Sequence, residues 1–366
     1  MSPVPAPAKV LVSGANGYIA AWVVRTLLEQ GYAVRGTVRA ASKGDHLKKI
    51  FSSYGDKFEL AVVEDITKDG AFDEAVKGVD LVEHTASPFH FNINHPDDLI
   101  VPAVKGTTSI LNSILKNGSS VKRVVLTASC ACVLKPGIIG KWDETSWNEP
   151  SILEVQEKGT KAPGIAMYRA SKTLAEKGTP DILRDSCFAC GDSRYSVVAA
   201  WEFVETHKGE IGWDLAVLNP PFVFGPPIHE VTSLDSLNTS MLDFFNAVVK
   251  GTKTNDELAS QGSALIDVRD LGLAHVLAAQ KAEAGGERII VSAGPFFWQE
   301  LVDVANSIQP PIIANLPKGV PGATKGKQYI IDYETGKSDR ILGLKPRSFE
   351  ETVRDILVDI KNRGYV

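Results

Sequence analysis

The stretch Lys9–Ala20 reads KVLVSGANGYIA and joins a short apolar run to an amphipathic segment through a turn that contains two glycines. The apolar run predicts a buried strand over residues 9–13, and the periodicity of the next segment predicts a helix over residues 18–30. A strand that leads directly into a helix begins a β-α-β unit. This unit is the starting point from which the fold of the whole chain can be predicted.

The turn has the pattern Gly-x-x-Gly-x-x-Ala. Gly14 permits a tight turn, Gly17 lets the backbone approach a pyrophosphate, and the small Ala20 lets the helix pack close to the sheet. A glycine triplet also occurs in purely structural turns, but its position after an N-terminal strand strengthens the dinucleotide interpretation. Because the N–H groups of a helix N-terminus attract phosphates, the predicted contacts are Gly14, Asn16, Gly17, Tyr18 and Ile19.

Short β-rich runs and amphipathic segments continue to alternate after this unit. Further strands are predicted over residues 33–38, 58–63, 80–85, 123–128 and 213–218. Helices are predicted between them over residues 42–54, 71–76, 96–116 and 166–177. This alternation predicts an α/β fold, a Rossmann-type doubly wound parallel sheet.

Beyond about residue 222 the alternation weakens, and helices mix with loops that are rich in proline and glycine. We therefore expect residues 1–221 to form mainly the dinucleotide-binding domain. Residues 222–366 should form mainly a smaller C-terminal substrate-binding lobe, interleaved with the last sheet elements over residues 263–293.

Composition narrows the possible partners. The 366 residues carry a formal net charge of −5, which gives no basic surface for nucleic acid. No apolar run approaches the roughly 20 residues of a membrane span, and the proline-rich N-terminus does not resemble a signal peptide. Four cysteines are too few for a disulfide framework, and we predict no metal site. We expect a cytoplasmic protein, monomeric or weakly dimeric, that acts on a small molecule.

The end of the second predicted strand indicates which dinucleotide binds. It reads Gly36-Thr37-Val38-Arg39, with Lys43 close behind and no acidic residue between. An NAD site usually has an acidic residue at this point to hold the ribose 2′-hydroxyl, whereas a guanidinium suits a 2′-phosphate. Arg39 and Lys43 could instead be solvated surface charges, but the missing carboxylate favours NADPH.

Other strand ends should also face the cofactor, because ligands of such sheets lie at the carboxyl ends of the strands. Asp65 could accept a hydrogen bond from the adenine amino group, although a helix N-cap role is nearly as plausible. The small residues Thr85, Ala86 and Ser87 would leave room for the cofactor. Additional cofactor contacts are expected at Ile66, Thr127 and Val223.

The pattern Tyr168-x-x-x-Lys172 places two side chains on one face of a predicted helix. A nearby ammonium lowers the pKa of a phenol, so Tyr168 could donate a proton to a carbonyl oxygen while hydride arrives from a nicotinamide. Lys172 could also hold the nicotinamide ribose, and Ser129 could donate a hydrogen bond to the same carbonyl oxygen. The pair alone is common by chance, but here it follows a glycine loop and a serine at a strand end.

Together these motifs resemble the extended short-chain dehydrogenases/reductases, and among them the fungal NADPH-dependent aldehyde and ketone reductases, relatives of dihydroflavonol reductase. The similarity covers nearly the whole chain through SGANGYIA (13–20), RGTVRAASK (35–43), HTASPFHF (84–91), PAVKGT (102–107), RVVLTAS (123–129), YRASK (168–172), AAWEF (199–203), LNPPFVFGP (218–226) and DVRDLGLAH (267–275).

This resemblance implies roles for individual residues. It implies Ser129, Tyr168 and Lys172 as the catalytic residues, and Arg39 and Lys43 as contacts of the 2′-phosphate. It also implies Pro220 near the nicotinamide, and it implies a substrate pocket that includes Phe89, Phe222 and Phe224.

One segment departs from the resemblance. In the related pattern the helix that carries Tyr168 and Lys172 continues directly into AAWEF, but here residues 178–199 intervene, with glycines, a proline, Cys187 and Cys190. Such residues do not continue an amphipathic helix. The segment could be a surface loop, a regulatory or metal-binding element, or the translation of an unspliced intron, which we favour. Two thiols alone make an incomplete zinc site.

Two other functions fit parts of these observations. A sugar-nucleotide epimerase or dehydratase uses the same fold and Tyr-Lys pair, but dehydratases typically have an acidic pair where this chain has Cys130-Ala131-Cys132. A non-catalytic NADPH-sensing protein would need no Tyr-Lys pair. The observations favour an NADPH-dependent reductase of aldehydes or ketones, with Tyr168 as proton donor.

Overall fold

The structure is a computed structural model that describes residues 3–87, 95–178 and 199–366. Its central feature is a seven-stranded sheet with the strand order β10-β7-β5-β4-β1-β2-β3. Every neighbouring pair in this sheet is parallel. The strands are β1 (Lys9–Ser13), β2 (Ala33–Val38), β3 (Phe58–Val62), β4 (Leu81–His84), β5 (Arg123–Thr127), β7 (Asp214–Asn219) and β10 (Arg288–Ile290). The predicted doubly wound parallel sheet is therefore confirmed.

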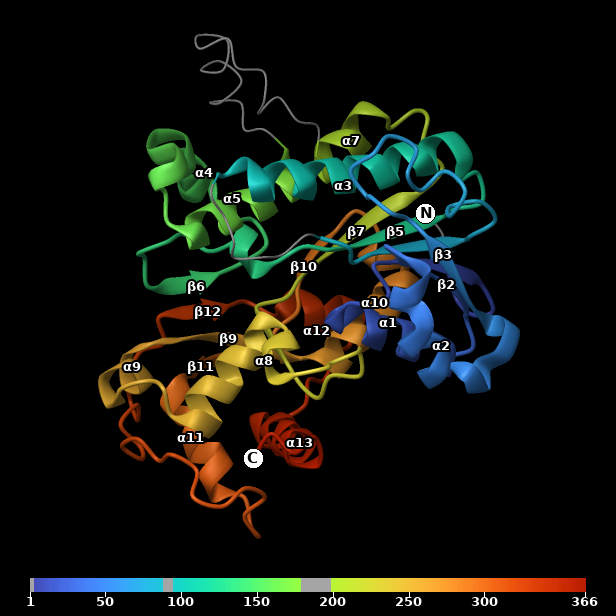
Figure 1. The fold of residues 1–366 in the computed structure, drawn as a ribbon. Helices are drawn as coiled ribbons and strands as arrows, with labels where there is room; N and C mark the ends of the chain where they lie inside the picture. The colour runs from blue at the N-terminus through green and yellow to red at the C-terminus, as the bar shows by residue number, and fades with distance from the viewer. Residues whose placement is uncertain (1–2, 88–94, 179–198) are drawn as a thin grey trace.

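Two layers of helices cover the sheet, as Figure 1 shows. One layer contains α1 (Tyr18–Glu29), α2 (Asp45–Ile50) and α10 (Val268–Gln280). The other layer contains α3 (Asp97–Asn117), α4 (Glu149–Lys158), α5 (Gly164–Lys177) and α7 (Ala200–Thr206). The central strands are buried on both faces, which explains the apolar runs in β5 and β7. In β4 the same burial extends to the polar residues Glu83 and His84.

Two small sheets lie beside the first, and all of their strands except β6 come from the C-terminal part of the chain. One has the order β11-β9-β8, and the other pairs β12 with β6. Their strands are β6 (Gly140–Trp142), β8 (Phe222–Phe224), β9 (Gly262–Asp267), β11 (Gly294–Phe297) and β12 (Ile331–Tyr333). The helices of this part are α8 (Thr239–Phe244), α9 (Asn255–Ser260), α11 (Trp298–Ser307), α12 (Gly336–Leu342) and α13 (Phe349–Asn362). None of the helices that the structure describes is long and apolar enough to cross a membrane.

Two predicted helices differ from the structure. Residues 71–76 form turns, in which Asp73 and Lys77 donate backbone hydrogen bonds to the residues three positions earlier. Gly70 and Gly78 flank these turns with positive φ angles of 74° and 68°, so no regular helix can extend from either side. The helix predicted over 42–54 is broken into α2 between short 3₁₀ turns.

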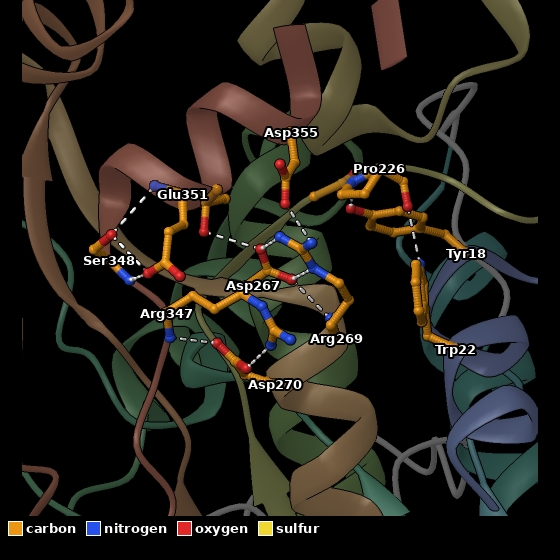
Figure 2. Close-up of polar contacts among 12 residues, drawn as sticks. Tyr18, Trp22, Pro226, Asp267, Arg269, Asp270, Arg347, Ser348, Glu351 and Asp355 are labelled. Atoms are coloured by element: carbon orange, nitrogen blue, oxygen red, sulfur yellow. Dashed lines mark hydrogen bonds and ion pairs between the residues drawn. The ribbon is translucent and has the colours of Figure 1, made fainter. Parts of the chain in front are cut away.

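A cluster of charged residues fastens α13 to the C-terminal end of β9, as Figure 2 shows. Arg269 lies between two carboxylates, with 2.7 Å from Nη2 to Asp267 Oδ2 and 2.5 Å from Nη1 to Asp355 Oδ2. Thr352 donates to Asp267 Oδ2 at 2.9 Å. Because Asp267 is 1% exposed, these contacts compensate the desolvation of a buried charge.

The same region is joined to the first helix of the chain (Figure 2). The Tyr18 hydroxyl donates to the carbonyl oxygen of Gly225 at 2.8 Å, and the Trp22 indole donates to that of Pro226 at 2.9 Å. Both acceptors directly follow β8. The helix that begins at the glycine turn is thereby attached to the strand that carries Phe222 and Phe224.

Candidate active site

The glycine turn between β1 and α1 is held against β2 by hydrogen bonds from its backbone N–H groups to Thr37. Gly14 N donates to Thr37 Oγ1 at 3.0 Å, and Ala15 N donates to Thr37 O at 2.8 Å. Gly14 has a φ of +63°, and a Cβ atom there would lie 3.1 Å from Cβ of Ala86. A larger residue would therefore be strained and crowded at this position.

The residues around this turn fit a dinucleotide with a 2′-phosphate. No side chain caps the first turn of α1, so its N–H groups can bind phosphate oxygens. Gly17 is exposed at the start of this helix. Arg39 and Lys43 are both exposed beyond the carboxyl end of β2, where the adenosine ribose of such a cofactor lies. Asn16 and Ile19 are half-buried in the same region.

Two predicted cofactor contacts have their side chains engaged elsewhere. The Tyr18 side chain is buried and directed to Gly225, so its backbone is the part that remains for a phosphate. Asp65 Oδ1 accepts from the N–H of Thr67 at 2.9 Å and from its hydroxyl at 2.7 Å. These hydrogen bonds lower the pKa of Asp65. Asp65 thus closes a local turn, which is close to the capping role weighed as its alternative, and its adenine contact stays a prediction.

Ser13 organises the end of the neighbouring strand β4. Its hydroxyl oxygen accepts from the N–H groups of Thr85 and Ala86, each at 3.0 Å. It also lies 2.9 Å from Nδ1 of His84, which is buried. Burial and the Lys172 ammonium lower the pKa of His84 to about 3, so its ring is neutral. Ser13 thus fixes the backbone at Thr85 and Ala86, where room for the cofactor is predicted.

A small pocket opens where β4, β5 and α5 meet. Four predicted site residues line it, namely Ala86, Ser87, Thr127 and Lys172. Its other lining residues are His84, Thr107, Leu126, Ala128, Ala175 and Glu176. The pocket therefore lies beside the predicted catalytic helix and at the carboxyl ends of the strands, where this class of sheet binds its ligands.

Tyr168 and Ser129 are brought together from α5 and the end of β5. Their side chains share a hydrogen bond, and Ser129 Oγ also accepts from the N–H of Ala131 at 3.1 Å. Desolvation raises the pKa of Tyr168 to about 12, although the hydrogen bond with Ser129 acts in the opposite direction. Tyr168 consequently carries its proton at neutral pH, which is the form that a proton donor needs.

The expected lowering of the Tyr168 pKa by Lys172 is not found. Lys172 Nζ donates to the Ser87 hydroxyl at 2.8 Å, and burial lowers the pKa of the lysine itself. The ammonium is thus directed toward the end of β4. Lys172 and Ser87, both predicted cofactor contacts, lie close together in the lining of the pocket.

Thr127 belongs to a buried chain of polar side chains. Its hydroxyl lies 3.0 Å from Nε2 of His275, and Nδ1 of His275 lies 2.7 Å from Glu83 Oε2. Glu83 and His275 are both 0% exposed. Because 192 residues separate Glu83 from His275 in the chain, no local pattern could have indicated their contact. The contacts with His275 and Glu83 orient the Thr127 side chain, which lines the pocket.

The predicted substrate residues differ in their surroundings. Phe89 lies outside the described residues. Phe224 is 1% exposed and packs edge-on against Phe244 and Phe296, with ring centroids 5.7 and 5.8 Å away. Phe222 is only partly buried, so it is better situated than Phe224 to meet a ligand. Pro220 O accepts from Cys130 N at 2.9 Å, and Val223 and Ile66 pack into the interior.

The segment predicted to be an insertion lies outside the described residues, apart from its flanks Gly178 and Ala199. Helix α5 ends at Lys177, and Gly178 follows with a φ of +100°. A Cβ atom at Gly178 would lie 2.4 Å from Oε2 of Glu202 in α7. The chain therefore leaves and re-enters the described structure close to the same point. The origin of residues 178–199 stays a hypothesis.

Comparisons with known proteins agree with this geometry. Residues 10–185 match the NAD dependent epimerase/dehydratase family. The chain is 35% identical to the NADPH-dependent methylglyoxal reductase GRE2 of Saccharomyces cerevisiae, across 94% of this chain and 96% of that protein. It is also 35% identical to the ketoreductase azaE of Aspergillus niger, across 96% and 97% of the two chains.

A solved structure of a related protein has the same fold as this chain. The crystal structure of the yeast methylglyoxal/isovaleraldehyde reductase Gre2 complexed with NADPH superposes with a TM-score of 0.77 and 32% identity. The superposition covers 98% of this chain and 100% of that one. The resemblance seen in the sequence motifs is therefore confirmed. The chain belongs to the NAD dependent epimerase/dehydratase family, the extended short-chain dehydrogenases/reductases.

Proposed function

We propose that this protein reduces small aldehydes or ketones to alcohols with NADPH, and that Tyr168 donates the proton. The observation that carries the proposal is the hydrogen bond between Tyr168 and Ser129 beside a pocket lined by Lys172. The methylglyoxal reductase and ketoreductase relatives support this reaction class. We further propose a cytoplasmic enzyme that is monomeric or weakly dimeric.

Each residue of the site has a distinct part in this reaction. NADPH, when bound, supplies the hydride. The protonated Tyr168 donates a proton to the carbonyl oxygen, and the Ser129 hydroxyl holds that oxygen in place. Lys172, with Ser87, binds the ribose beside the reacting centre. Arg39 and Lys43 bind the 2′-phosphate, because both cations are exposed beyond the end of β2 and no acidic residue lies between them in the chain.

The test is consumption of NADPH absorbance with a panel of carbonyl compounds, including methylglyoxal, branched aliphatic aldehydes and aryl ketones. We expect saturable turnover with at least one of them, and chiral analysis of the alcohols would define the stereochemistry. Tight NADPH binding without turnover of any carbonyl would favour the sensing protein instead. Release of a rearranged sugar nucleotide without net NADPH consumption would indicate the epimerase.

Reversing the charge at Arg39 should change cofactor preference. In Arg39→Glu, the new carboxylate repels a 2′-phosphate and can accept a hydrogen bond from a 2′-hydroxyl. We expect kcat/KM with NADPH to fall by roughly 10²-fold, in line with the loss of a charge-assisted bidentate contact, while that with NADH rises.

The matched control for this variant is Arg25→Glu. Arg25 lies on α1 with its guanidinium 5.2 Å from the Trp22 ring centroid, away from the end of β2. It should leave the ratio of the two cofactors unchanged. An unaltered ratio in Arg39→Glu would contradict the 2′-phosphate assignment.

A further inference from the structure

The face of α5 that carries Tyr168 and Lys172 continues to Glu176, one turn further along. Glu176 is 1% exposed, and both of its carboxylate oxygens have partners. Oε1 accepts from Nε of Arg288 at 2.5 Å, and Oε2 accepts from Nδ2 of Asn219 at 2.8 Å. A fully buried carboxylate on the catalytic face has no role in the reaction proposed above, and it needs an explanation.

Asn219 carries the contact onward to the catalytic serine. It is 0% exposed, and its Nδ2 also donates to the backbone carbonyl of Ser129 at 3.2 Å. Both neighbours of this nitrogen are acceptors only, so the amide can point in one orientation alone. One amide group therefore bridges the helix that carries Tyr168 and the strand end that carries Ser129.

The backbone around Asn219 holds the same segment from a second side. The carbonyl oxygen of Asn219 accepts from Sγ of Cys130 at 3.1 Å, and that of Pro220 accepts from Cys130 N at 2.9 Å. Residues 129 and 130 are thus fastened to the end of β7 by both backbone and side-chain contacts. The position of the Ser129 hydroxyl depends on where this strand end lies.

Arg288 holds the Glu176 carboxylate in a fixed orientation. Its Nη1 donates to the carbonyl oxygens of Glu144 at 2.5 Å and Ser146 at 3.0 Å. Its guanidinium lies 3.4 Å from the centroid of the Trp147 ring. A planar group held by three sets of contacts presents Nε to Glu176 in a fixed direction. The ion pair therefore has little freedom to turn away from Asn219.

We propose that Glu176 and Asn219 are positioning residues that set the distance and angle of the hydrogen bond between Ser129 and Tyr168. The expected effect on kcat rests on the proposed carbonyl reduction. The expected effect on the hydrogen bond between Ser129 and Tyr168 does not. Neither residue touches the reacting atoms; they act through the backbone of Ser129. A misplacement of a catalytic group by about 1 Å can lower the rate by about 100-fold.

The first experiment is Asn219→Ala, which removes the contacts to Ser129 and Glu176 while it leaves the ion pair with Arg288 intact. We expect kcat to fall by about 10- to 100-fold, with the dissociation constant for NADPH within about threefold of wild type. Glu176→Gln should have the same signature. Glu176 and Asn219 act through the same series of hydrogen bonds to Ser129. The kcat of the double variant should therefore be no more than about twofold below that of the worse single variant.

A spectroscopic measurement tests the inference without turnover. In protein labelled with ¹³Cζ-tyrosine, the signal of Tyr168 is assigned by its loss in Tyr168→Phe. We expect this signal to move in both Asn219→Ala and Glu176→Gln, because the hydrogen bond with Ser129 changes. Glu149→Gln is the matched control, since Glu149 pairs with Lys177 at the exposed end of the same helix, and it should leave both kcat and the signal unchanged.

The outcomes separate the two proposals. An unmoved Tyr168 signal in folded Asn219→Ala and Glu176→Gln overturns the positioning role, whatever the activity. If wild-type protein reduces no carbonyl but the signal moves, the proposed reaction fails and the positioning role stands. If Glu176→Gln does not fold, Asn219→Ala decides the question alone. A fall in NADPH affinity as large as the fall in kcat would indicate that the whole site is disrupted. That result would also overturn the positioning role.

Discussion

Tyr168→Phe should lower kcat by roughly 10²- to 10⁴-fold, the contribution typical of a positioned general acid. The substitution removes only the hydroxyl that bonds to Ser129, and the ring remains to fill the space between α5 and the strand ends. NADPH affinity should therefore stay within about threefold of wild type, because the glycine turn and Arg39 lie elsewhere. The measurements are steady-state NADPH oxidation and a fluorescence titration of the cofactor.

A second tyrosine provides the control for this result. Tyr365 lies next to the C-terminal residue and packs partly against the core, so Tyr365→Phe removes a hydroxyl far from the site. Its kcat should equal that of wild type. Turnover by Tyr168→Phe at more than a tenth of the wild-type rate would exclude Tyr168 as the proton donor.

Arg123→Met should be the most destabilising single change considered for this chain. Arg123 is 0% exposed at the start of β5, and its Nε and Nη2 donate to the two carboxylate oxygens of Asp214 at 2.6 and 2.9 Å. Its Nη1 donates to the carbonyl oxygens of Ala278 and Lys281 at 2.7 and 2.5 Å. Methionine fills similar space but donates no hydrogen bond to these carbonyl oxygens or to the Asp214 carboxylate.

Removing one partner of a buried ion pair costs about 3–5 kcal/mol. The urea midpoint of Arg123→Met should fall accordingly, followed by circular dichroism. The neighbouring Lys122→Met is the control, because that lysine has a 55% exposed side chain 3.6 Å from Asp80, and exposed pairs contribute about 0–1 kcal/mol. Arg123→Met together with Asp214→Leu should recover part of the loss. A shift below about 1 kcal/mol in Arg123→Met would show that water or other groups replace its contacts.

The sequence predicts best those helices and strands whose hydrophobic pattern runs over many consecutive residues. Strands β1, β2, β5 and β7 and helix α1 lie within one or two residues of the predicted ranges, because a buried strand or an amphipathic helix leaves its mark on consecutive residues. Residues 71–76 show where this fails. Their apolar spacing suits a helix, but Gly70 and Gly78 adopt φ angles that no helix contains.

The features of the candidate site also differ in whether consecutive residues reveal them. The glycine turn and the Tyr168–Lys172 spacing are visible in a few consecutive residues. Ser13, Asn219 and His275 stand in stretches that carry the family resemblance, but their contacts, like those of Glu83 and Arg288, are not visible there. Each of these residues acquires its partner from a distant part of the chain. The protonation of Tyr168 was also beyond reach, since the pKa depends on how deeply the hydroxyl is buried and on the direction of the Lys172 ammonium. Glu176 could have been noticed as a carboxylate on the catalytic face.

The place of β10 in the central sheet has a consequence for how the protein is made. This strand, at residues 288–290, pairs with β7 and completes a sheet that otherwise consists of residues before 220. Until it leaves the ribosome, β7 is a bare edge with unpaired backbone groups and an apolar surface, the kind of edge at which sheets aggregate. We therefore expect that the nucleotide-binding half does not fold as an autonomous unit. A nascent chain must be kept from self-association until more than three quarters of it has been synthesised.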